Sequence, residues 1–152
     1  MAAEPTISQY ERSAGIVLYR LNKNQRNQRE YLLLEYNYPS RFWGLCKGLI
    51  EQDEDPQQTA LREAAEETSY THIELHPRFR EKTSYFFRRN DKYVSKTVLW
   101  FCGKVLDTHE GKVSFEHTRL IWLPFEQAVE KVTYDNDKKM IREAEEFLKT
   151  MK

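Results

Sequence analysis

The chain has 152 residues, enough for one domain with a sizeable core, and its 24 lysines and arginines balance its 24 aspartates and glutamates. This zero net charge argues against a protein that coats nucleic acid or membranes through a basic surface, but it allows an anionic substrate held by a few local cations. Cys46 and Cys102 provide no disulfide framework, so we expect a reducing, cytoplasmic compartment. No apolar run approaches the roughly 20 residues that span a bilayer, and we expect no membrane partner.

The first third of the chain predicts a short tail followed by two strands. Residues 1–12 carry acids and polar residues without the apolar stretch of a signal peptide, so we expect a flexible tail there and a single domain over residues 13–152. The runs Ser13–Tyr19 and Tyr31–Tyr36 are rich in β-forming residues and predict strands joined by a polar hairpin loop. Phe42–Gly48 then contains two glycines, which let the backbone turn or pass close to a ligand.

A helix is predicted in the stretch that follows. Asp55 can cap its start, Pro56 suits the first helical position, and Gln58 lies three residues after the cap. We expect the helix to run to about Thr68. Its packing face would consist of small and apolar residues at helical spacing, namely Ala60, Leu61, Ala64, Ala65 and Thr68.

The opposite face of this helix would carry three carboxylates within one turn. Glu63, Glu66 and Glu67 stand at i, i+3 and i+4, and like charges at this spacing repel one another. A hard divalent cation such as Mg²⁺ would reverse the sign of that interaction, because it takes oxygen ligands from carboxylates and substrate phosphates. Arg62 could fix one carboxylate through a forked ion pair. The alternative is a solvated acidic face that binds nothing.

The second half of the chain predicts more strands and two closing helices. A weak strand is expected at Thr71–Leu75. Two long strands follow at Phe79–Arg89 and Tyr93–Val105, joined by a turn at 89–92, and a final strand is expected at Leu120–Leu123. The helices are expected at Pro124–Lys131 and 136–149, the second with an apolar stripe. A series of strands that is interrupted by one helix and followed by two further helices predicts an α/β fold, in which helices cover both faces of a sheet.

The charged residues around the first helix resemble a known signature. Gly48, five residues, Glu54, seven residues and then Arg62-Glu63-Ala64-Ala65-Glu66-Glu67 resembles the box of the Nudix hydrolases, and every charged position of that motif is present. Ser69 departs from the motif, because the family usually has glycine there. Glycine permits a left-handed backbone at the helix end, which serine adopts at a cost of order 1 kcal/mol.

Segments outside the box extend the resemblance over roughly Ser13 to Leu148. The chain is similar there to the asymmetrically cleaving diadenosine tetraphosphate hydrolases in SAGIVLYR, EYLLLEYNYP, WGLCKG, SKTVLWF and FEHTRLIWLPFEQAVEKVTYDNDKKMI. The resemblance implies the Nudix α/β/α sandwich, in which a mixed β-sheet lies between helices. It also implies that dinucleoside polyphosphates are hydrolysed to nucleoside tri- and monophosphate, with Mg²⁺ or Mn²⁺ as cofactor.

The resemblance also implies roles for individual residues. The implied metal ligands are Glu63, Glu66, Glu67, Glu116 and the backbone carbonyl of Gly48. Glu54 would be a ligand or a base for water, Glu116 could instead activate water, and Arg62 would be structural. On sequence alone, Glu116 would be a surface residue.

The substrate would be held by aromatic rings and cations. Tyr85 and Tyr134 match residues that sandwich an adenine, and Lys96 matches a lysine that contacts the polyphosphate, with Lys47 as a further cation for the leaving phosphates. Read without the resemblance, the tyrosines would be packing residues and Lys96 a solvated lysine.

Three departures fall where the phosphates are expected to bind. The family commonly has Pro-Pro, histidines and His-Glu-His where this chain has Leu45-Cys46, Arg41-Phe42 and Phe115-Glu116-His117.

Because of these departures, two alternative functions stay open. One is a Nudix enzyme that acts on the 5′ end of RNA, because WGLCKGLIEQDEDP also resembles mRNA decapping enzymes, although a short neutral chain leaves little room for RNA-binding surface. The other is a non-catalytic domain that senses a nucleotide. A monomer is expected in each case.

Overall fold

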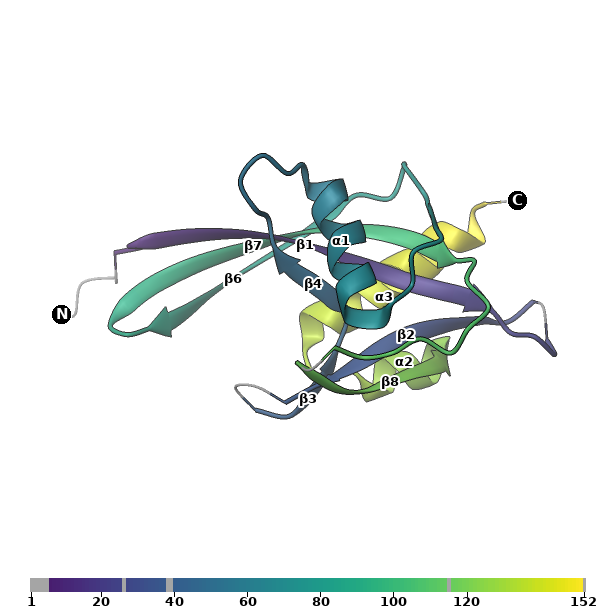
Figure 1. The fold of residues 1–152 in the computed structure, drawn as a ribbon. Coiled ribbons are helices and arrows are strands. Elements are labelled where there is room, and N and C mark those ends of the chain that lie inside the picture. The colour runs from purple at the N-terminus through teal and green to yellow at the C-terminus, as the bar shows by residue number, and fades with distance from the viewer. Residues whose placement is uncertain (1–5, 26, 38–39, 115, 152) are drawn as a thin grey trace.

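The computed structural model describes residues 6–25, 27–37, 40–114 and 116–151 (Figure 1). Within them the elements in chain order are β1 (Gln9–Leu21), β2 (Arg29–Tyr36), β3 (Phe42–Gly44), β4 (Cys46–Leu49), α1 (Pro56–Thr68), β5 (Ile73–Leu75), β6 (Glu81–Arg89), β7 (Lys92–Val105), β8 (His117–Pro124), α2 (Phe125–Lys131) and α3 (Asp135–Lys149). Over these same ranges, no helix is both long enough and apolar enough to cross a membrane.

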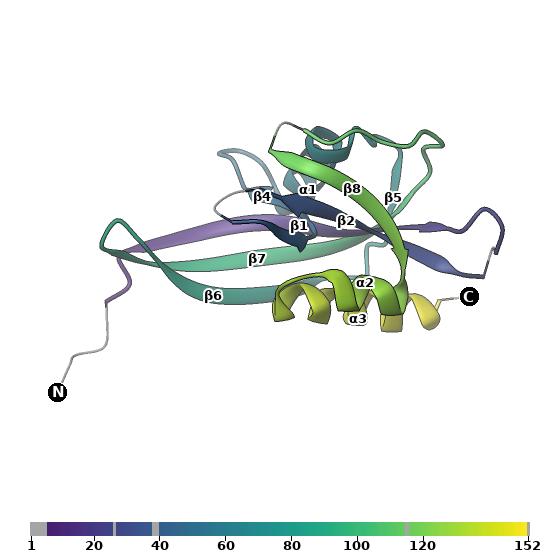
Figure 2. The same ribbon diagram turned by 90° about the horizontal axis from the view of Figure 1, so that it is seen from below.

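The strands form one mixed sheet between helices. Its path runs β3–β2–β1–β7–β5, while β4 pairs with β1, β6 with β7 and β8 with β2. β1 and β7 run parallel, and the other pairs are antiparallel. Helix α1 covers one face, and α2 and α3 cover the other (Figure 2). This arrangement confirms the predicted α/β fold with a covered sheet.

Each face of the sheet has its own apolar core, because side chains alternate between the two faces of a strand. On the side of α1, Ala60 and Ala64 are fully buried against Ile16 and its neighbours. On the other side, Trp100 packs in a second cluster with Met140 of α3. The alanines of the predicted packing face thus let α1 approach the sheet closely.

Helix α1 follows its predicted boundaries and caps. The side chain of Asp55 accepts a hydrogen bond from the backbone N–H of Gln58, whose side chain accepts one from the Asp55 N–H in return. The helix ends at Thr68, and Ser69 takes the left-handed conformation, with φ 66°. The three carboxylates of the predicted acidic face differ in exposure. Glu66 is exposed, Glu63 is largely buried against Gly48, and Glu67 is 4% exposed.

Two parts of the sheet differ from the sequence-based expectation. β1 begins at Gln9, so residues 9–12, expected in the tail, pair with β7. The sequence predicts neither β3 nor β4, because both are short and neither shows an alternating pattern. Tyr38 and Pro39 of the segment EYLLLEYNYP, and Phe115 of Phe115-Glu116-His117, lie outside the described residues.

The outer parts of β1, β6 and β7 project beyond the helices, on the left of both views (Figures 1 and 2). The turn that joins β6 to β7 is centred on Asn90 and Asp91, both with positive φ, 50° and 66°. Two such residues define the tight hairpin turn that matches the twist of paired strands.

Candidate active site

Strand β4 brings backbone directly against the middle of α1. Gly48 pairs with Ala14 of β1, and a Cβ atom at Gly48 would overlap the side chain of Glu63. Glycine at this position therefore leaves the room in which the Glu63 carboxylate lies. Burial raises the pKa of Glu63, while the neighbouring guanidinium of Arg62 opposes that shift.

Arg62 connects several acidic side chains at this junction. Its Nε and Nη2 donate to the two oxygens of Glu54 at 2.6 and 3.1 Å, which is the fork that the sequence suggests. Its Nη1 donates to Glu63 at 2.9 Å and to Glu66 at 3.2 Å. The Arg62 hydrogen bonds, followed by one from the Thr59 hydroxyl, hold the pKa of Glu54 at about 2. Both oxygens of Glu54 are thus occupied as acceptors.

Glu67, Glu116 and His117 come together although Glu67 lies on α1 and the other two lie at the entry to β8. One ligand atom from each lies within 4.8 Å of the others. Glu67 Oε1 accepts a hydrogen bond from the backbone N–H of Lys47 at 3.2 Å, and its Oε2 lies 3.6 Å from His117 Nε2. Burial, with the charges of Glu63 and Glu116, raises the pKa of Glu67 to about 9.

This group of side chains fits a divalent cation. Buried carboxylates that approach one another without an equal number of cations repel, and oxygen ligands of this kind suit Mg²⁺ or Mn²⁺. His117 Nε2 is buried and has no hydrogen-bond partner in the part of the chain that the structure describes. Sequence reasoning gave His117 no metal role, and its place beside Glu116 in the chain was the only available signal.

Two lysines lie beside the same aromatic ring. Lys96 of β7 is opposite Tyr85 of β6, and the Nζ atom of Lys47 lies 5.9 Å from the centre of the Tyr85 ring. Burial, together with the charge of Lys47, lowers the pKa of Lys96. Two cations this close to one another favour an anion between them.

A comparison with protein families matches residues 9–144 to the Nudix domain. The chain belongs to the Nudix family. It is a Nudix hydrolase related to proteins named asymmetrical bis(5′-nucleosyl)-tetraphosphatase. That of Caenorhabditis elegans is 28% identical over 137 residues, which cover 90% of this chain and 96% of the relative. That of Mus musculus is 29% identical over 143 residues, which cover 90% and 95%. The crystal structure of a C. elegans Ap4A hydrolase binary complex superposes with a TM-score of 0.80 at 28% identity, over 93% of this chain and 99% of that one.

The Nudix domain presents the two candidate stacking tyrosines differently. Tyr85 is half-buried against the core on the α3 side, whereas Tyr134 is 49% exposed and packs edge-on against Phe42 at 5.2 Å. Phe42 in turn stacks on Tyr36 at 4.5 Å, and Tyr36 meets the ring of His117 at 4.3 Å. Aromatic rings thus lead from Tyr134 to the candidate metal site. Among the described contacts, none joins the rings of Tyr85 and Tyr134.

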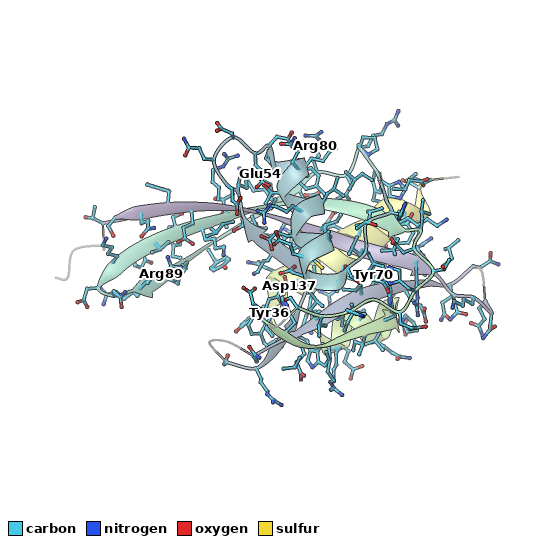
Figure 3. All side chains as sticks on the ribbon, in the orientation of Figure 1. Tyr36, Glu54, Tyr70, Arg80, Arg89 and Asp137 are labelled. Atoms are coloured by element: carbon cyan, nitrogen blue, oxygen red, sulfur yellow. The ribbon has the colours of Figure 1, made fainter. Side chains whose placement is uncertain are left out.

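Asp137 is a candidate that the sequence analysis missed. It lies in the first turn of α3, is 4% exposed, and its Oδ2 would be 3.1 Å from a Cβ atom at Gly44. Burial raises the pKa of Asp137 to about 6, and Lys47 opposes that shift. Asp137 and Tyr36, both labelled in Figure 3, lie beside Gly44. The available signal was its place in the apolar stripe of α3, three residues before Met140.

Two sizeable cavities of the Nudix domain lie apart from the candidate metal ligands. One of about 330 Å³ lies beside the start of α1 and is lined by Asp55, Arg80 and Phe101 among others. The other, of about 440 Å³, lies between Arg29 of β2 and the C-terminal part of α3. Neither is lined by the carboxylates that converge at β4 and β8, so the candidate active site is defined by its charges.

Proposed function

We propose that this Nudix hydrolase cleaves dinucleoside polyphosphates, such as diadenosine tetraphosphate, to nucleoside tri- and monophosphate. The observation that carries the proposal is the meeting of Glu67 with Glu116 and His117, close to two lysines and an aromatic ring. Similarity to named tetraphosphatases over 90% of the chain supports the same substrate class.

The residues proposed to hold Mg²⁺ or Mn²⁺ are Glu63, Glu66, Glu67 and the carbonyl of Gly48, with Glu116 beside them for the attacking water. A bound divalent ion supplies charge neutralisation of the phosphates and lowers the pKa of water. In the protein without metal, Arg62 bonds both Glu63 and Glu66 and thereby keeps these carboxylates oriented. His117, whose free nitrogen faces Glu67, would position that carboxylate.

Glu116 is the proposed base for the attacking water. Glu54 is the other candidate from the family resemblance, but Arg62 and Thr59 already occupy its oxygens, and its low pKa makes it a weak proton acceptor. A glutamate that accepts the water proton contributes about 10²–10⁴ in rate. The oxygen of water then bonds to one phosphorus, the anhydride P–O bond to the leaving nucleotide breaks, and the proton of water passes to the carboxylate of Glu116.

Lys47 and Lys96 are proposed to bind the polyphosphate and to stabilise the charge that develops on the leaving phosphates. The bases would stack on Tyr85 and Tyr134, which contributes about 1–3 kcal/mol per base without strong base selectivity. Two free, buried cysteines support the proposal that the enzyme acts in the reducing cytoplasm. Light scattering on the purified protein tests the expected monomer.

The proposal is tested with a panel of substrates. Purified protein and Mg²⁺ are incubated with dinucleoside polyphosphates, nucleoside triphosphates and 5′-triphosphorylated RNA, and the products are separated by chromatography. We expect ATP and AMP from diadenosine tetraphosphate as the fastest reaction. Glu66→Gln should lower turnover by orders of magnitude while the protein stays folded. Faster cleavage of triphosphorylated RNA would favour the RNA-end alternative, and cleavage of no substrate would favour the nucleotide sensor.

Glu116→Gln tests the proposed base within the same assay. The change removes the proton acceptor but keeps the shape of the side chain, so we expect kcat to fall by about 10²-fold or more and KM to change little. Glu110→Gln, an exposed change in the loop before β8, is the matched control and should leave both constants unaltered. If kcat and KM of Glu116→Gln equalled those of the parent, Glu116 would be a surface residue without a role in catalysis.

A further inference from the structure

One face of the projecting part of the sheet carries no residue proposed for the reaction. The outer parts of β1, β6 and β7, residues 9–12, 82–89 and 92–97, form a three-stranded blade that extends beyond α1 on one side and beyond α2 and α3 on the other (Figures 1 and 2). On the α3 side of the blade, Tyr85 packs against the core and Val94 is buried. On the α1 side, by contrast, large side chains remain exposed.

The strand register determines which side chains share the face on the α1 side. Phe86 of β6 and Tyr10 of β1 are both opposite Ser95 of β7, so the three residues form one cross-strand row. Alternate residues of a strand point to the same face, so the residues two positions away along each of the three strands also lie on this face. The blade face, as we call it, consists of Tyr10, Arg12, Lys82, Ser84, Phe86, Arg88, Tyr93, Ser95 and Thr97.

Aromatic rings lie open on the blade face. Tyr10 is 73% exposed and Phe86 is 54% exposed. The ring of Phe86 stacks nearly parallel on that of Tyr93, with centres 5.6 Å apart. Neighbouring strands are about 4.8 Å apart, so Tyr10 and Phe86 stand roughly 10 Å apart across the small side chain of Ser95. Rings presented in this way offer their faces to another flat group.

The charge of the blade face is entirely positive. Arg12, Lys82 and Arg88 belong to it, it contains no aspartate or glutamate, and in the described structure none of its cations forms an ion pair. The opposite face differs, because Arg89 there is paired with Glu11 (Arg89 is labelled in Figure 3). In a chain of zero net charge, unpaired cations and exposed rings thus gather on one face.

We propose that the blade face binds single-stranded RNA. Unpaired bases stack on exposed aromatic rings, while phosphates interact with lysine and arginine. A double helix keeps its bases stacked on one another and would leave the rings of Tyr10 and Phe86 unused. The hydroxyls of Ser84, Ser95 and Thr97 lie on the same face and can bond the 2′-OH that distinguishes RNA from DNA.

The blade face also adjoins the candidate active site. The backbone carbonyl of Arg12 accepts a hydrogen bond from Ile50, two residues after Gly48, at 3.0 Å. An RNA strand that lies on the blade can therefore continue toward the carboxylates. The proposal itself does not depend on the reaction catalysed there, since it concerns binding to a separate surface.

Binding is measured by fluorescence anisotropy with a single-stranded RNA of about 12 nucleotides, within the usual site size of such surfaces. The probe carries a 5′-hydroxyl and a 3′ fluorophore, so that it offers the carboxylate site no polyphosphate. Loss of one stacking ring in Phe86→Ala should weaken binding at least about fivefold. Arg88→Ala should lower the slope of log affinity against log salt by about 0.7–1.

Matched controls remove similar groups from other exposed positions. Leu106→Ala removes an exposed apolar side chain, and Arg142→Ala removes an exposed arginine of α3; neither should alter RNA affinity. Tyr10→Ala tests the face from a different strand if Phe86→Ala disturbs the hairpin. Hydrolysis of diadenosine tetraphosphate is followed in parallel and should be unchanged in the blade variants, which separates this proposal from the proposed function.

Three results would overturn the proposal. The first is equal RNA affinity in the parent, Phe86→Ala and Arg88→Ala. The second is tighter binding of a DNA strand of the same sequence than of the RNA strand. The third is a parent dimer, detected by light scattering, that Phe86→Ala dissociates, because the face would then be an interface between copies of the chain.

Discussion

Ser69 ends α1 in a conformation that suits glycine better than serine. Its φ of 66° lies in the left-handed region, its N–H donates to the Ala65 carbonyl at 2.9 Å, and no described hydrogen bond uses its hydroxyl. Ser69→Gly should therefore raise the free energy of unfolding by up to about 1 kcal/mol, with part of the gain offset by the freedom of glycine in the unfolded chain. Urea titration of the metal-free protein measures the difference.

Ser69→Ala provides the control for this prediction. Alanine keeps the Cβ atom and its steric penalty, so the free energy of unfolding should change by only a few tenths of a kcal/mol. A glycine variant no more stable than the parent would mean that the strain at Ser69 is negligible.

At the scale of elements, the contact between β4 and α1 places the carboxylates. Gly48→Ala would put a methyl group where the Glu63 side chain lies, so either the carboxylate or the strand must move. A displacement of about 1 Å costs on the order of 10²-fold in rate, and overpacking costs about 1–3 kcal/mol of stability. Steady-state kinetics and thermal unfolding on the same variant measure the two effects.

Leu49→Ala is the matched control, since Leu49 is the next residue of β4 and its side chain is largely exposed. It should retain the activity of the parent and lie within about 0.5 kcal/mol of its stability. If Gly48→Ala kept full activity, the close approach of backbone and carboxylate would have no role in catalysis.

Elements with a strong local pattern could be predicted from the sequence. The boundaries of α1 follow from the cap at Asp55 and the apolar spacing that ends at Thr68, and the structure matches both. The turn between β6 and β7 follows from Asn90 and Asp91, which tolerate positive φ. In these segments local and tertiary interactions favour the same conformation.

Features that depend on distant partners could not be predicted. Strands β3 and β4 are stable only because β2 and β1 supply their hydrogen bonds. The inward turn of Glu67 depends on the backbone of Lys47 and on the start of β8. The family resemblance brought Glu116 to the candidate site, whereas composition and spacing left it on the surface. His117 carries no local mark of burial, and the only mark of Asp137 is its place in the apolar stripe of α3.

At the scale of the whole molecule, the two cores place a buried acid where the sheet meets α3. Asp137 of α3 is close to Gly44 of β3, and the nearby charge of Lys47 of β4 opposes the rise of its pKa. The charge of Asp137 in turn contributes to the raised pKa values of Tyr36 of β2 and Tyr85 of β6. In the described structure its carboxylate accepts no hydrogen bond from another residue. Burial without such bonds disfavours the ionised form.

The stability of the protein should therefore depend on pH through Asp137. Its folded pKa of about 6 lies above the value near 4 of an unfolded chain, so the folded state holds the proton more tightly. The resulting stabilisation is complete below about pH 4 and is lost as the pH rises to about 6. Asp137→Asn removes the titrating group and should raise the free energy of unfolding at pH 8 by about 1–3 kcal/mol. Asp135→Asn, an exposed change two residues earlier, should reproduce the parent profile. Urea titrations from pH 4 to 8 measure the free energy of unfolding of the three proteins. If that free energy changed with pH in the same way for Asp137→Asn and the parent, Asp137 would be solvated or paired in solution.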